Sequence, residues 1–429
     1  MRIVDGTWPG DRDDDRSVHP DHRVRDEPFV TARFDVDVAG VGAGPAGLVT
    51  AIACAERGLS VRVLDRRSAP IDKACGEGLM PDALAVLDEL GVLLPVHRPI
   101  RGIRYLDDRH FVEGRFPSRS GCGVRRPKLH KALLDRAGMI GVDVCERVGI
   151  TGLRACSEDT RSVRWVLDSD EGLVVPRWIV GADGLHSKLR HWSGLASGEL
   201  RLAPRRFGIR RHFKVCPWTE FVEVHWSDGA EAYVTPVASD VVGVAVLWSP
   251  PRSTTQPAYA AWPGEVVEDR LGTFDRLLRS FPVLADRLSN IEVVSRTMAA
   301  GPLRQRARGV TCGNLALVGD AAGYVDAITG EGMALAFHQA VDLADAIAAG
   351  DLSTYPAAHR RHRRVPNLLT EAALGLARNP RLRRRALAAL AEEPAFFDQI
   401  LAVQSGDAEL RTLVSAPLGR GLFHLVTGR

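Results

Sequence analysis

Three glycines near residue 45 have the spacing of a loop that binds a phosphate group. Gly42, Gly44 and Gly47 form the pattern GxGxxG, and Asp65 follows the last of them by 18 residues. In this pattern the first glycine permits a tight turn, the second lets the backbone approach a pyrophosphate, and the third allows a helix to pack closely on a strand. The acid binds ribose hydroxyls. The spacing therefore predicts a dinucleotide site made by Gly42, Gly44, Pro45, Ala46, Gly47, Asp65 and Arg66.

The residues around these glycines have the hydrophobic pattern of a strand, a helix and a second strand. FDVDVAGVG (34–42) is typical of a buried strand, and GPAGLVTAIACAERG (44–58) of a helix that stops at its last glycine. LSVRVLDRR (59–67) is typical of another strand. The glycine pattern requires this βαβ context, because the helix N-terminus then faces the phosphates.

Further along the chain the pattern changes to alternating strands and then returns to helices. Residues 207–248 alternate like an antiparallel sheet with a hairpin turn at 227–229, and NLALVGD (314–320) is typical of a buried parallel strand. We therefore expect an α/β protein, with a Rossmann-like dinucleotide-binding domain, an inserted antiparallel β-sheet substrate domain and C-terminal helices. The expected segments are a disordered leader at 1–33, the binding domain at 34–70, 124–195 and 296–350, the substrate domain at 71–123 and 196–295, and the helices at 351–429.

Composition excludes several classes of protein. The chain has 429 residues, of which 45% are hydrophobic, and a net charge of only +3, so a disordered chain or a nucleic-acid partner is not expected. Its seven cysteines form no CxxC pair, which argues against a metal site or a disulfide framework. The same cysteine pattern indicates reduced thiols, and no apolar segment is long enough for a signal peptide or membrane span, so we expect a cytoplasmic protein without stable membrane insertion. Either a monomer or a homodimer is expected.

Two further segments resemble the remaining signatures of a flavoprotein family. Gly181–Gly184, followed by Ser187 and Arg190, and Gly319–Ala322, followed by Gly330–Gly332, are similar in order and spacing to motifs of FAD-dependent aromatic hydroxylases of the para-hydroxybenzoate hydroxylase type. The resemblance covers about residues 34–350 and implies bound FAD with NAD(P)H as a transient reductant. It implies FAD contacts at Arg126, Asp183, Gly319, Asp320, Gly330, Gly332 and Met333, the last two at a helix end suited to the reduced flavin.

Two segments depart from the aromatic hydroxylases and resemble the geranylgeranyl-reductase-like branch of the same superfamily. The chain has Gly323 and then Asp326-Ala327 where the hydroxylases usually have histidine and proline, and it carries KACGEGL at 73–79 and TGEG at 329–332. This branch includes prenyl reductases, hydroxylases of specialised metabolism and relatives of flavin halogenases. The departure leaves the expected fold unchanged and widens the range of reactions.

Five residues are candidates for a role in catalysis, and three of them have a structural alternative. Cys75 is the proton donor that a reductase would need, or a small residue that shapes its loop, and Glu77 lies beside it. Arg211 is the polar member of an otherwise apolar row on one strand, and His225 is either a base for a phenol or a structural histidine. Glu331 is either an acid beside the flavin or the cap of the helix that follows it. The pattern of the basic segment predicts a solvated helix face that carries Arg381, Arg383, Arg384 and Arg385.

The resemblance implies a monooxygenase. FAD would be reduced by NAD(P)H and would then add O2 at C4a to form a hydroperoxide, which hydroxylates or epoxidises an aromatic or polyketide-like small molecule. The main alternative is an FAD-dependent reductase of prenyl or quinone-chain double bonds. The second alternative is a flavin-dependent halogenase, which the absence of the WxWxIP signature disfavours, or a non-catalytic flavin-binding protein.

Overall fold

The computed structural model describes residues 34–156, 163–198, 205–250 and 272–414. The expected leader at 1–33 therefore lies outside the described residues. Residues from Phe34 onward belong to one compact unit, and the description below concerns that unit. No helix among the described residues is long and apolar enough to cross a membrane.

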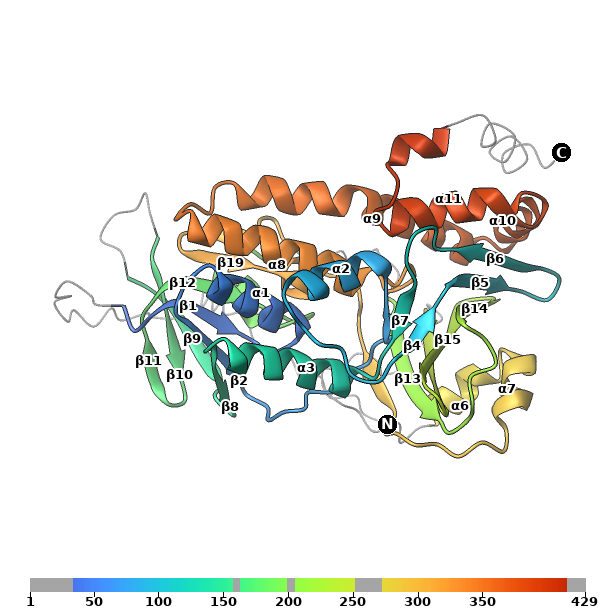
Figure 1. Ribbon diagram of the computed structural model, residues 1–429, viewed down its shortest axis with the longest axis horizontal. Coiled ribbons are helices and arrows are strands. Elements are labelled where there is room, and N and C mark those ends of the chain that lie inside the picture. The colour runs from blue at the N-terminus through green and yellow to red at the C-terminus, as the bar shows by residue number, and fades with distance from the viewer. Residues whose placement is uncertain (1–33, 157–162, 199–204, 251–271, 415–429) are drawn as a thin grey trace, which may run out of the picture. The chain divides into compact units, whose positions relative to one another are not determined.

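The first sheet is built around the predicted βαβ unit. Its six strands have the order β18-β19-β12-β1-β2-β8, and all neighbours are parallel except β18 and β19. Helix α1 packs against both α3 and α8, as Figure 1 shows. The strands are β1 (Val36–Val41), β2 (Val61–Asp65), β8 (Asp143–Glu146), β12 (Pro176–Gly181), β18 (Thr311–Cys312) and β19 (Leu315–Leu317), and the helices are α1 (Pro45–Glu56), α3 (Arg126–Met139) and α8 (Gly332–Ala348).

The second large sheet has seven strands in the order β17-β13-β16-β15-β14-β5-β6. Its neighbours are antiparallel except β14 and β5, and Gly229 makes the predicted hairpin turn with a φ of 81°. Alternate residues share a face of a sheet, so its two faces have different neighbours. The strands are β5 (Gly102–Leu106), β6 (Phe111–Arg115), β13 (Phe207–Phe213), β14 (Phe221–Ser227), β15 (Ala230–Ala238), β16 (Val241–Trp248) and β17 (Met298–Ala300).

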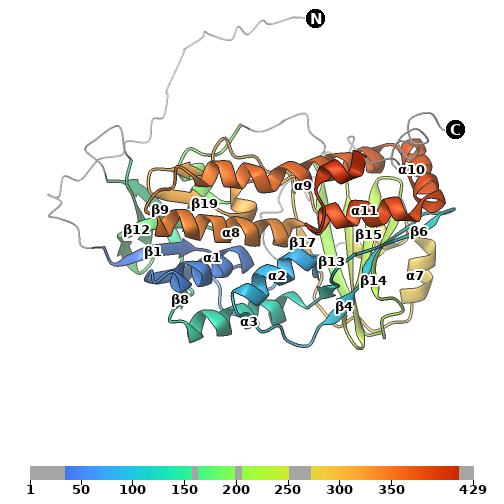
Figure 2. The ribbon, with the colours of Figure 1, turned by 45° about the horizontal axis from the view of Figure 1, so that its top comes forward.

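One face of this sheet packs on α6 (Thr273–Leu278) and α7 (Pro282–Leu288), and we call it the outer face. Phe207, Ile209 and Phe213 lie on it, in one apolar cluster with Phe274 of α6. The opposite, inner face carries residues of the main core, such as Val224, which continues to the first sheet and the C-terminal helices. Those helices are α9 (Tyr355–Arg378), α10 (Pro380–Glu392) and α11 (Pro394–Gln404), and α10 and α11 pack on β6 (Figure 2).

Shorter elements complete the described structure. A three-stranded sheet contains β9 (Ile150–Ala155), β10 (Trp165–Ser169) and β11 (Gly172–Val174), and another contains β3 (Gly78–Leu79), β4 (Arg98–Ile100) and β7 (Gly121–Gly123). The remaining helices are α2 (Pro81–Glu89), α4 (Lys188–Trp192) and the 3-10 turns η1 (Gly319–Ala322) and η2 (Leu410–Val414).

The predicted fold class is confirmed, and two local expectations are corrected. Strand β17 lies within 296–350, the range expected in the dinucleotide domain, yet it pairs with β13 of the second sheet. Arg383 does not lie on a solvated face: it is only 5% exposed, and its guanidinium donates to Asp228 and to the Ser227 carbonyl. The neighbouring Arg381, Arg384 and Arg385 are exposed as expected.

Candidate active site

The glycine loop between β1 and α1 has the geometry that its spacing predicts. Gly42 has a φ of 105°, and a Cβ atom on Gly47 would lie 1.9 Å from the Gly42 carbonyl oxygen, so neither position accepts a side chain. A Cβ on Gly44 would meet nothing within 4 Å, which leaves the α1 N-terminus open to a ligand. Asp65, at the end of β2, accepts a hydrogen bond from the Ala43 N–H at 2.9 Å, so the acid lies directly against this loop.

The second and third motifs meet the first one. A Cβ on Gly42 would lie 2.4 Å from the Ala182 carbonyl oxygen, and one on Gly319 would lie 2.9 Å from Ala46. Arg190 is buried and donates to the Ala321 carbonyl oxygen at 2.9 Å, which ties the second motif to the third. The three motifs, separated by more than 100 residues in the sequence, therefore form one site.

Charged groups gather around Asp320 in the third motif. Burial raises the pKa of Asp320, and Lys73, Arg126, Arg363 and Arg190 oppose that rise with their positive charge. Burial, with the charges of Arg67 and Arg126, lowers the pKa of Lys73 to about 8. An acid among this many cations suits a ligand that carries both hydroxyl and phosphate groups.

Two buried polar atoms at this site lack a hydrogen-bond partner among the described residues. They are Nε of Arg126 and Oδ1 of Asp183. Burial raises the pKa of Asp183 although its other oxygen accepts from the Leu189 N–H at 3.1 Å. Buried polar groups in folded proteins normally have partners, so orphaned atoms beside an open glycine loop fit a bound polar ligand such as FAD.

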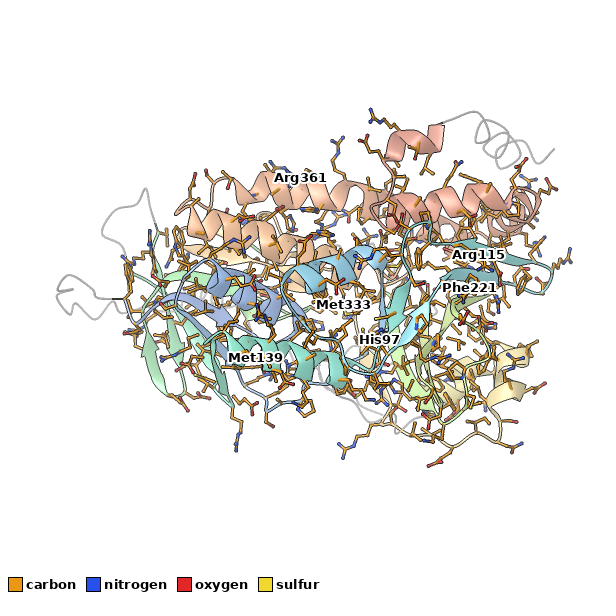
Figure 3. The ribbon with its side chains drawn as sticks, in the orientation of Figure 1. His97, Arg115, Met139, Phe221, Met333 and Arg361 are labelled. Carbon is orange, nitrogen blue, oxygen red and sulfur yellow. The ribbon has the colours of Figure 1, made fainter. Side chains whose placement is uncertain are left out.

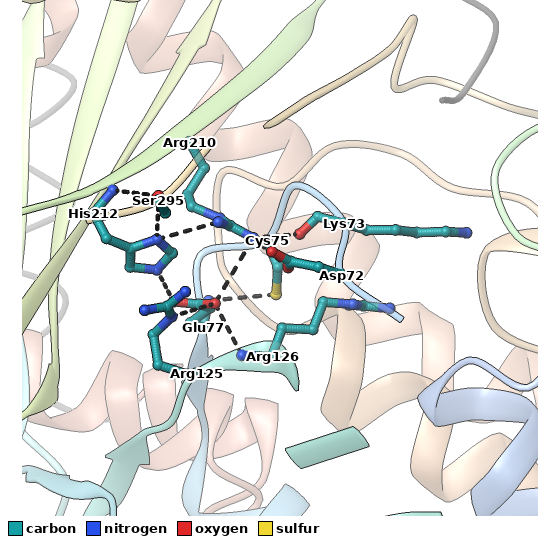
Figure 4. Close-up of polar contacts among 9 residues, drawn as sticks. All are labelled: Asp72, Lys73, Cys75, Glu77, Arg125, Arg126, Arg210, His212 and Ser295. Carbon is teal, nitrogen blue, oxygen red and sulfur yellow. Dashed lines mark hydrogen bonds and ion pairs between the residues drawn. The ribbon is translucent and has the colours of Figure 1, made fainter. Parts of the chain in front are cut away.

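Glu77 is the centre of a polar cluster that joins β13 to the start of α3 (Figure 4). It is 1% exposed and has a φ of 60°, a left-handed conformation that is uncommon outside glycine. Its Oε1 accepts from the Arg126 N–H at 2.9 Å, and its Oε2 lies 2.5 Å from Nε2 of His212 on β13. Its own N–H donates to Sγ of Cys75 at 3.3 Å. Glu77 thus links β13 to the two residues expected beside the cofactor.

The partners of His212 fix its protonation. Nη1 of Arg210 lies 3.1 Å from Nδ1 of His212, and a guanidinium can only donate, so Nδ1 must accept. The ring is therefore neutral, with its proton on Nε2, and this N–H donates to Glu77. Burial lowers the pKa of His212, and the charge of Arg210 lowers it further, in agreement with a neutral ring. Oγ of Ser295, 2.9 Å away, is a second donor to Nδ1.

Glu77 itself remains an anion. Burial would raise the pKa of Glu77, but the hydrogen bond from His212 and the positive charge of Arg210 hold it below the usual value. Arg210 also donates to Asp72 at 2.5 Å, which gives the cluster a second carboxylate. The cluster thus pairs its carboxylates with arginine side chains and is suited to hold neighbouring groups in place.

The structure does not bring Arg211 and His225 to this cluster. Both lie on the outer face of the second sheet, because Arg211 alternates with Arg210 and His212 along β13. Its guanidinium lies over the ring of Phe274, 4.4 Å from the centroid, and donates to Asp275. His225 contacts Glu223 at 3.2 Å, beside Trp218. Arg210 and His212, on the opposite face of β13, contact Glu77 instead.

Sequence reasoning missed Arg210 and His212 because it assigned the apolar row of β13 to the pocket. The apolar row instead packs on α6, and the polar residues at alternate positions, Arg210 and His212, face Glu77. The signal that identifies this face is the pair Arg210 and His212, two charged or titratable residues two positions apart and so on one face of the strand. At the other end of the site, Met333 lies in the first turn of α8, half-buried against the core and labelled in Figure 3.

A cavity of about 730 Å³ opens beside the polar cluster. Ser295 and Arg125 belong to its wall, and Nε of Arg125 lies 3.8 Å from Oε1 of Glu77. Its wall has five arginines and a single carboxylate, Asp72, so the cavity has the charge to attract an anion. The arginines are Arg66, Arg67, Arg125, Arg147 and Arg296.

The site's architecture is that of a known family. Residues 35–351 match the model of the FAD binding domain. The chain belongs to this family. It is therefore an FAD-dependent oxidoreductase, and the predicted cofactor FAD is confirmed.

Related sequences fall into two groups. Menaquinone reductase of Mycobacterium tuberculosis is 29% identical over 316 residues, which cover 69% of this chain and 72% of the relative. The 3-(3-hydroxy-phenyl)propionate/3-hydroxycinnamic acid hydroxylase of Mycolicibacterium gilvum is 29% identical over 175 residues, 39% of this chain and 31% of the relative. A flavin-dependent monooxygenase of Mycobacteroides abscessus is 32% identical over 177 residues, 36% of each chain.

Solved structures share the fold at low sequence identity. A flavoprotein/dehydrogenase from Cytophaga hutchinsonii has a TM-score of 0.74 and 18% identity, with 92% of this chain and 99% of that chain covered. PqsL, a probable FAD-dependent monooxygenase from Pseudomonas aeruginosa, has a TM-score of 0.60 and 21% identity, with 87% and 100% covered. These likenesses confirm the α/β architecture.

Proposed function

We propose that the protein is an NAD(P)H- and O2-dependent monooxygenase that hydroxylates or epoxidises an aromatic or polyketide-like small molecule in specialised metabolism. The observation that carries this proposal is the convergence of the three FAD motifs at one site, next to a sheet face rich in aromatic side chains. The reaction consumes NAD(P)H, a proton, O2 and substrate, and yields NAD(P)+, water and a product with one added oxygen atom. FAD supplies the redox chemistry. The protein binds and orients the substrate and excludes water from the site.

The chain's own residues hold FAD in this proposal. The α1 N-terminus at Gly44 and Pro45 faces the pyrophosphate, and Asp65 accepts from the adenosine ribose. Asp320 accepts from the ribityl hydroxyls, and the guanidinium of Arg126 pairs with a phosphate. The α8 N-terminus at Gly332 and Met333 directs N–H groups toward negative charge on the reduced ring.

The inner face of the second sheet is the proposed substrate side. Tyr105 stacks on Phe397 with ring centroids 4.8 Å apart and meets the edge of Trp226 at 5.7 Å. Tyr233 lies on the same face, and its hydroxyl donates to the Ile328 carbonyl oxygen in the loop before α8. Aromatic side chains that already pack against one another favour a flat, apolar ligand.

The arginine-lined cavity is the proposed docking place of the reductant. The phosphates of NAD(P)H are polyanionic, and arginine forks match their geometry. The cavity shares Arg125 and Ser295 with the Glu77 cluster, so a dinucleotide there lies next to the loop that carries Cys75. The expectations of a cytoplasmic location, a monomeric or homodimeric state and no nucleic-acid partner remain part of this proposal.

A second candidate function is reduction of a prenyl or quinone-chain double bond. It is favoured by the menaquinone reductase relative, which matches over most of both chains, whereas the hydroxylase relatives match over shorter segments. In this alternative Cys75 is the proposed proton donor opposite the hydride, and O2 is not consumed.

Isotope labelling distinguishes the two functions. Purified holoprotein is supplied with NADPH and a panel of phenols, aromatic polyketides and menaquinones under oxygen-18 gas, and products are read by mass spectrometry. One labelled oxygen atom in a product supports the monooxygenase. A product that gains two hydrogens, formed equally well under nitrogen, supports the reductase and contradicts the first proposal.

A further inference from the structure

Glu331 precedes the first turn of α8 but does not cap the helix. A carboxylate at this position commonly accepts hydrogen bonds from the first free N–H groups. The Glu331 side chain makes no such bond and is 6% exposed, and its Oε2 is buried without a hydrogen-bond partner among the described residues. Of the two roles that the sequence left open, the geometry excludes the cap.

The groups around this carboxyl favour its neutral form. Asp82, on α2, faces it with a negative charge and is itself 3.3 Å from His338 of α8. Tyr105, on β5, also interacts with it. Burial first, and then Asp82, raise the pKa of Glu331 to about 8, whereas hydrogen bonds with Thr329 and with Gln404 of α11 lower it. Near pH 7 the side chain is therefore mainly a carboxylic acid that can donate a proton.

The loop before Glu331 is fixed to the substrate side of the second sheet. Arg206 bridges Asp326 of this loop, at 2.9 Å, and Glu231 of β15, at 2.6 Å. Glu231 is paired with Trp226 across β14 and β15, and each has a buried polar atom, Oε1 and Nε1, without a partner among the described residues. The inner face of the second sheet thus carries a donor and an acceptor without partners among the described residues. Glu331 directly precedes the α8 N-terminus, which is proposed to face the flavin.

We propose that Glu331 is the acid that supplies the proton consumed in the reaction. This inference rests on the proposed NAD(P)H-dependent flavoenzyme activity and holds for both candidate functions, since each consumes one proton for every NAD(P)H. In the reductase it gives to Glu331 the role for which the sequence offered Cys75, whose Sγ accepts from the Glu77 N–H at 3.3 Å. The O–H bond of Glu331 breaks. Its proton bonds to the oxygen atom that leaves as water, or to the substrate atom next to the one that receives the hydride. The electron pair stays on the carboxylate, and water reprotonates it.

Menadione is a suitable probe because it has no titrating group and its reduction to the quinol by NADPH consumes one proton. Under nitrogen, the wild-type kcat/KM for menadione is expected to be constant below pH 7 and to fall about tenfold per pH unit above pH 8. In Glu331→Gln, kcat/KM for menadione at pH 7 is expected to be at least tenfold lower than in the wild type. It should also show no decrease above pH 8. Asp82→Asn removes a negative charge that raises the pKa of Glu331, so the decrease in kcat/KM of this variant is expected to begin at a lower pH than in the wild type. Glu371→Gln, at an exposed ion pair with Arg304, is the control and should match the wild type.

Infrared difference spectroscopy of the FAD-loaded protein tests the proposal without turnover. A carbonyl band of a protonated carboxylic acid should be present in the wild type at pH 6.5, weaken by pH 9.5 and be absent from Glu331→Gln. A missing band overturns the proposal, because an ionised Glu331 has no proton to give. A pH profile of Glu331→Gln that superimposes on the wild type also overturns it. Neither readout depends on incorporation of O2, so failure of the monooxygenase proposal is seen separately.

Discussion

Nε2 of His212 lies 2.5 Å from Oε2 of Glu77, and this contact joins segments 135 residues apart. Arg210 can only donate to the opposite ring nitrogen, so the proton between His212 and Glu77 must come from the ring. The bond therefore has one direction, and it needs a hydrogen-bond acceptor at position 77. This requirement explains why a non-glycine residue is held in a left-handed conformation there.

Glu77→Gln should disrupt this cluster although it preserves shape. The amide oxygen must accept from the Arg126 N–H, which turns the NH2 group toward Nε2 of His212 and forces the ring proton onto Nδ1, opposite Arg210. Because the substitution leaves buried groups unpaired, we expect a loss of about 3 kcal/mol in the free energy of unfolding. Urea unfolding of the holoprotein measures it.

Glu113→Gln is the matched control for that loss. Glu113 is also paired with an arginine, Arg104, but its side chain is 25% exposed. The free energy of unfolding of Glu113→Gln should be less than about 1 kcal/mol below that of the wild type. Equal losses in the two variants would show that the direction of the hydrogen bonds around Glu77 has no special importance.

Asp320→Ala should yield protein depleted in FAD. Removal of this carboxylate takes away the proposed ribityl acceptor and a negative charge that interacts with Lys73 and Arg126. The ratio of flavin to protein absorbance after gel filtration is expected to fall at least tenfold. Asp320→Asn keeps an acceptor and should retain more FAD than the alanine variant. Full occupancy in the alanine variant contradicts the assigned role.

Arg296→Ala should weaken the binding of NADPH without changing the chemical step. Its guanidinium lines the arginine-rich cavity, and loss of one phosphate contact corresponds to about a tenfold change in affinity. Anaerobic stopped-flow reduction of FAD should show a higher apparent Kd for NADPH and an unchanged limiting rate. Arg381→Ala, on the exposed face of α10, should behave as the wild type. A lower limiting rate with unchanged Kd would place the reductant elsewhere.

Glu331 should also affect stability as a function of pH. The pKa of Glu331 is about 8 in the folded chain and ordinarily 4.5, so the folded state binds more protons between these values. The free energy of unfolding therefore falls as pH rises from 5 to 8, relative to Glu331→Gln, by at most about 1.4 kcal/mol per pH unit. Urea midpoints of the two proteins across this range measure the difference. A constant difference would mean that the carboxyl is already ionised at pH 5.

Local patterns were enough to predict the fold and the cofactor loop, and long-range contacts were not. The strand, helix and glycine spacing around Gly42 depend on neighbouring residues only, so the sequence indicates them directly. The face of β13 that meets the site depends on which helix covers the other side, and an apolar row with Arg211 was a misleading guide. The partnership of Glu77 with His212 has no local signal, since neither residue's spacing encodes it.

Gly44 and Gly47 allow cofactor binding to be separated from folding. A Cβ at position 47 would lie 1.9 Å from the Gly42 carbonyl oxygen, so Gly47→Ala must shift the backbone and should lose both stability and FAD. A Cβ at position 44 meets no protein atom within 4 Å. Gly44→Ala should therefore fold with an unchanged urea midpoint as apoprotein and still bind FAD at least tenfold more weakly, because its methyl group occupies space that the pyrophosphate needs.

The control for this pair is Gly375→Ala, in the interior of α9, where a Cβ also meets nothing within 4 Å. It should retain FAD and gain up to about 1 kcal/mol, because alanine is the better helix former. If Gly44→Ala binds FAD as tightly as the wild type, the pyrophosphate does not approach this loop, and the open N-terminus of α1 is not the cofactor's anchor. If Gly44→Ala unfolds with Gly47→Ala, the loop's glycines serve the fold alone.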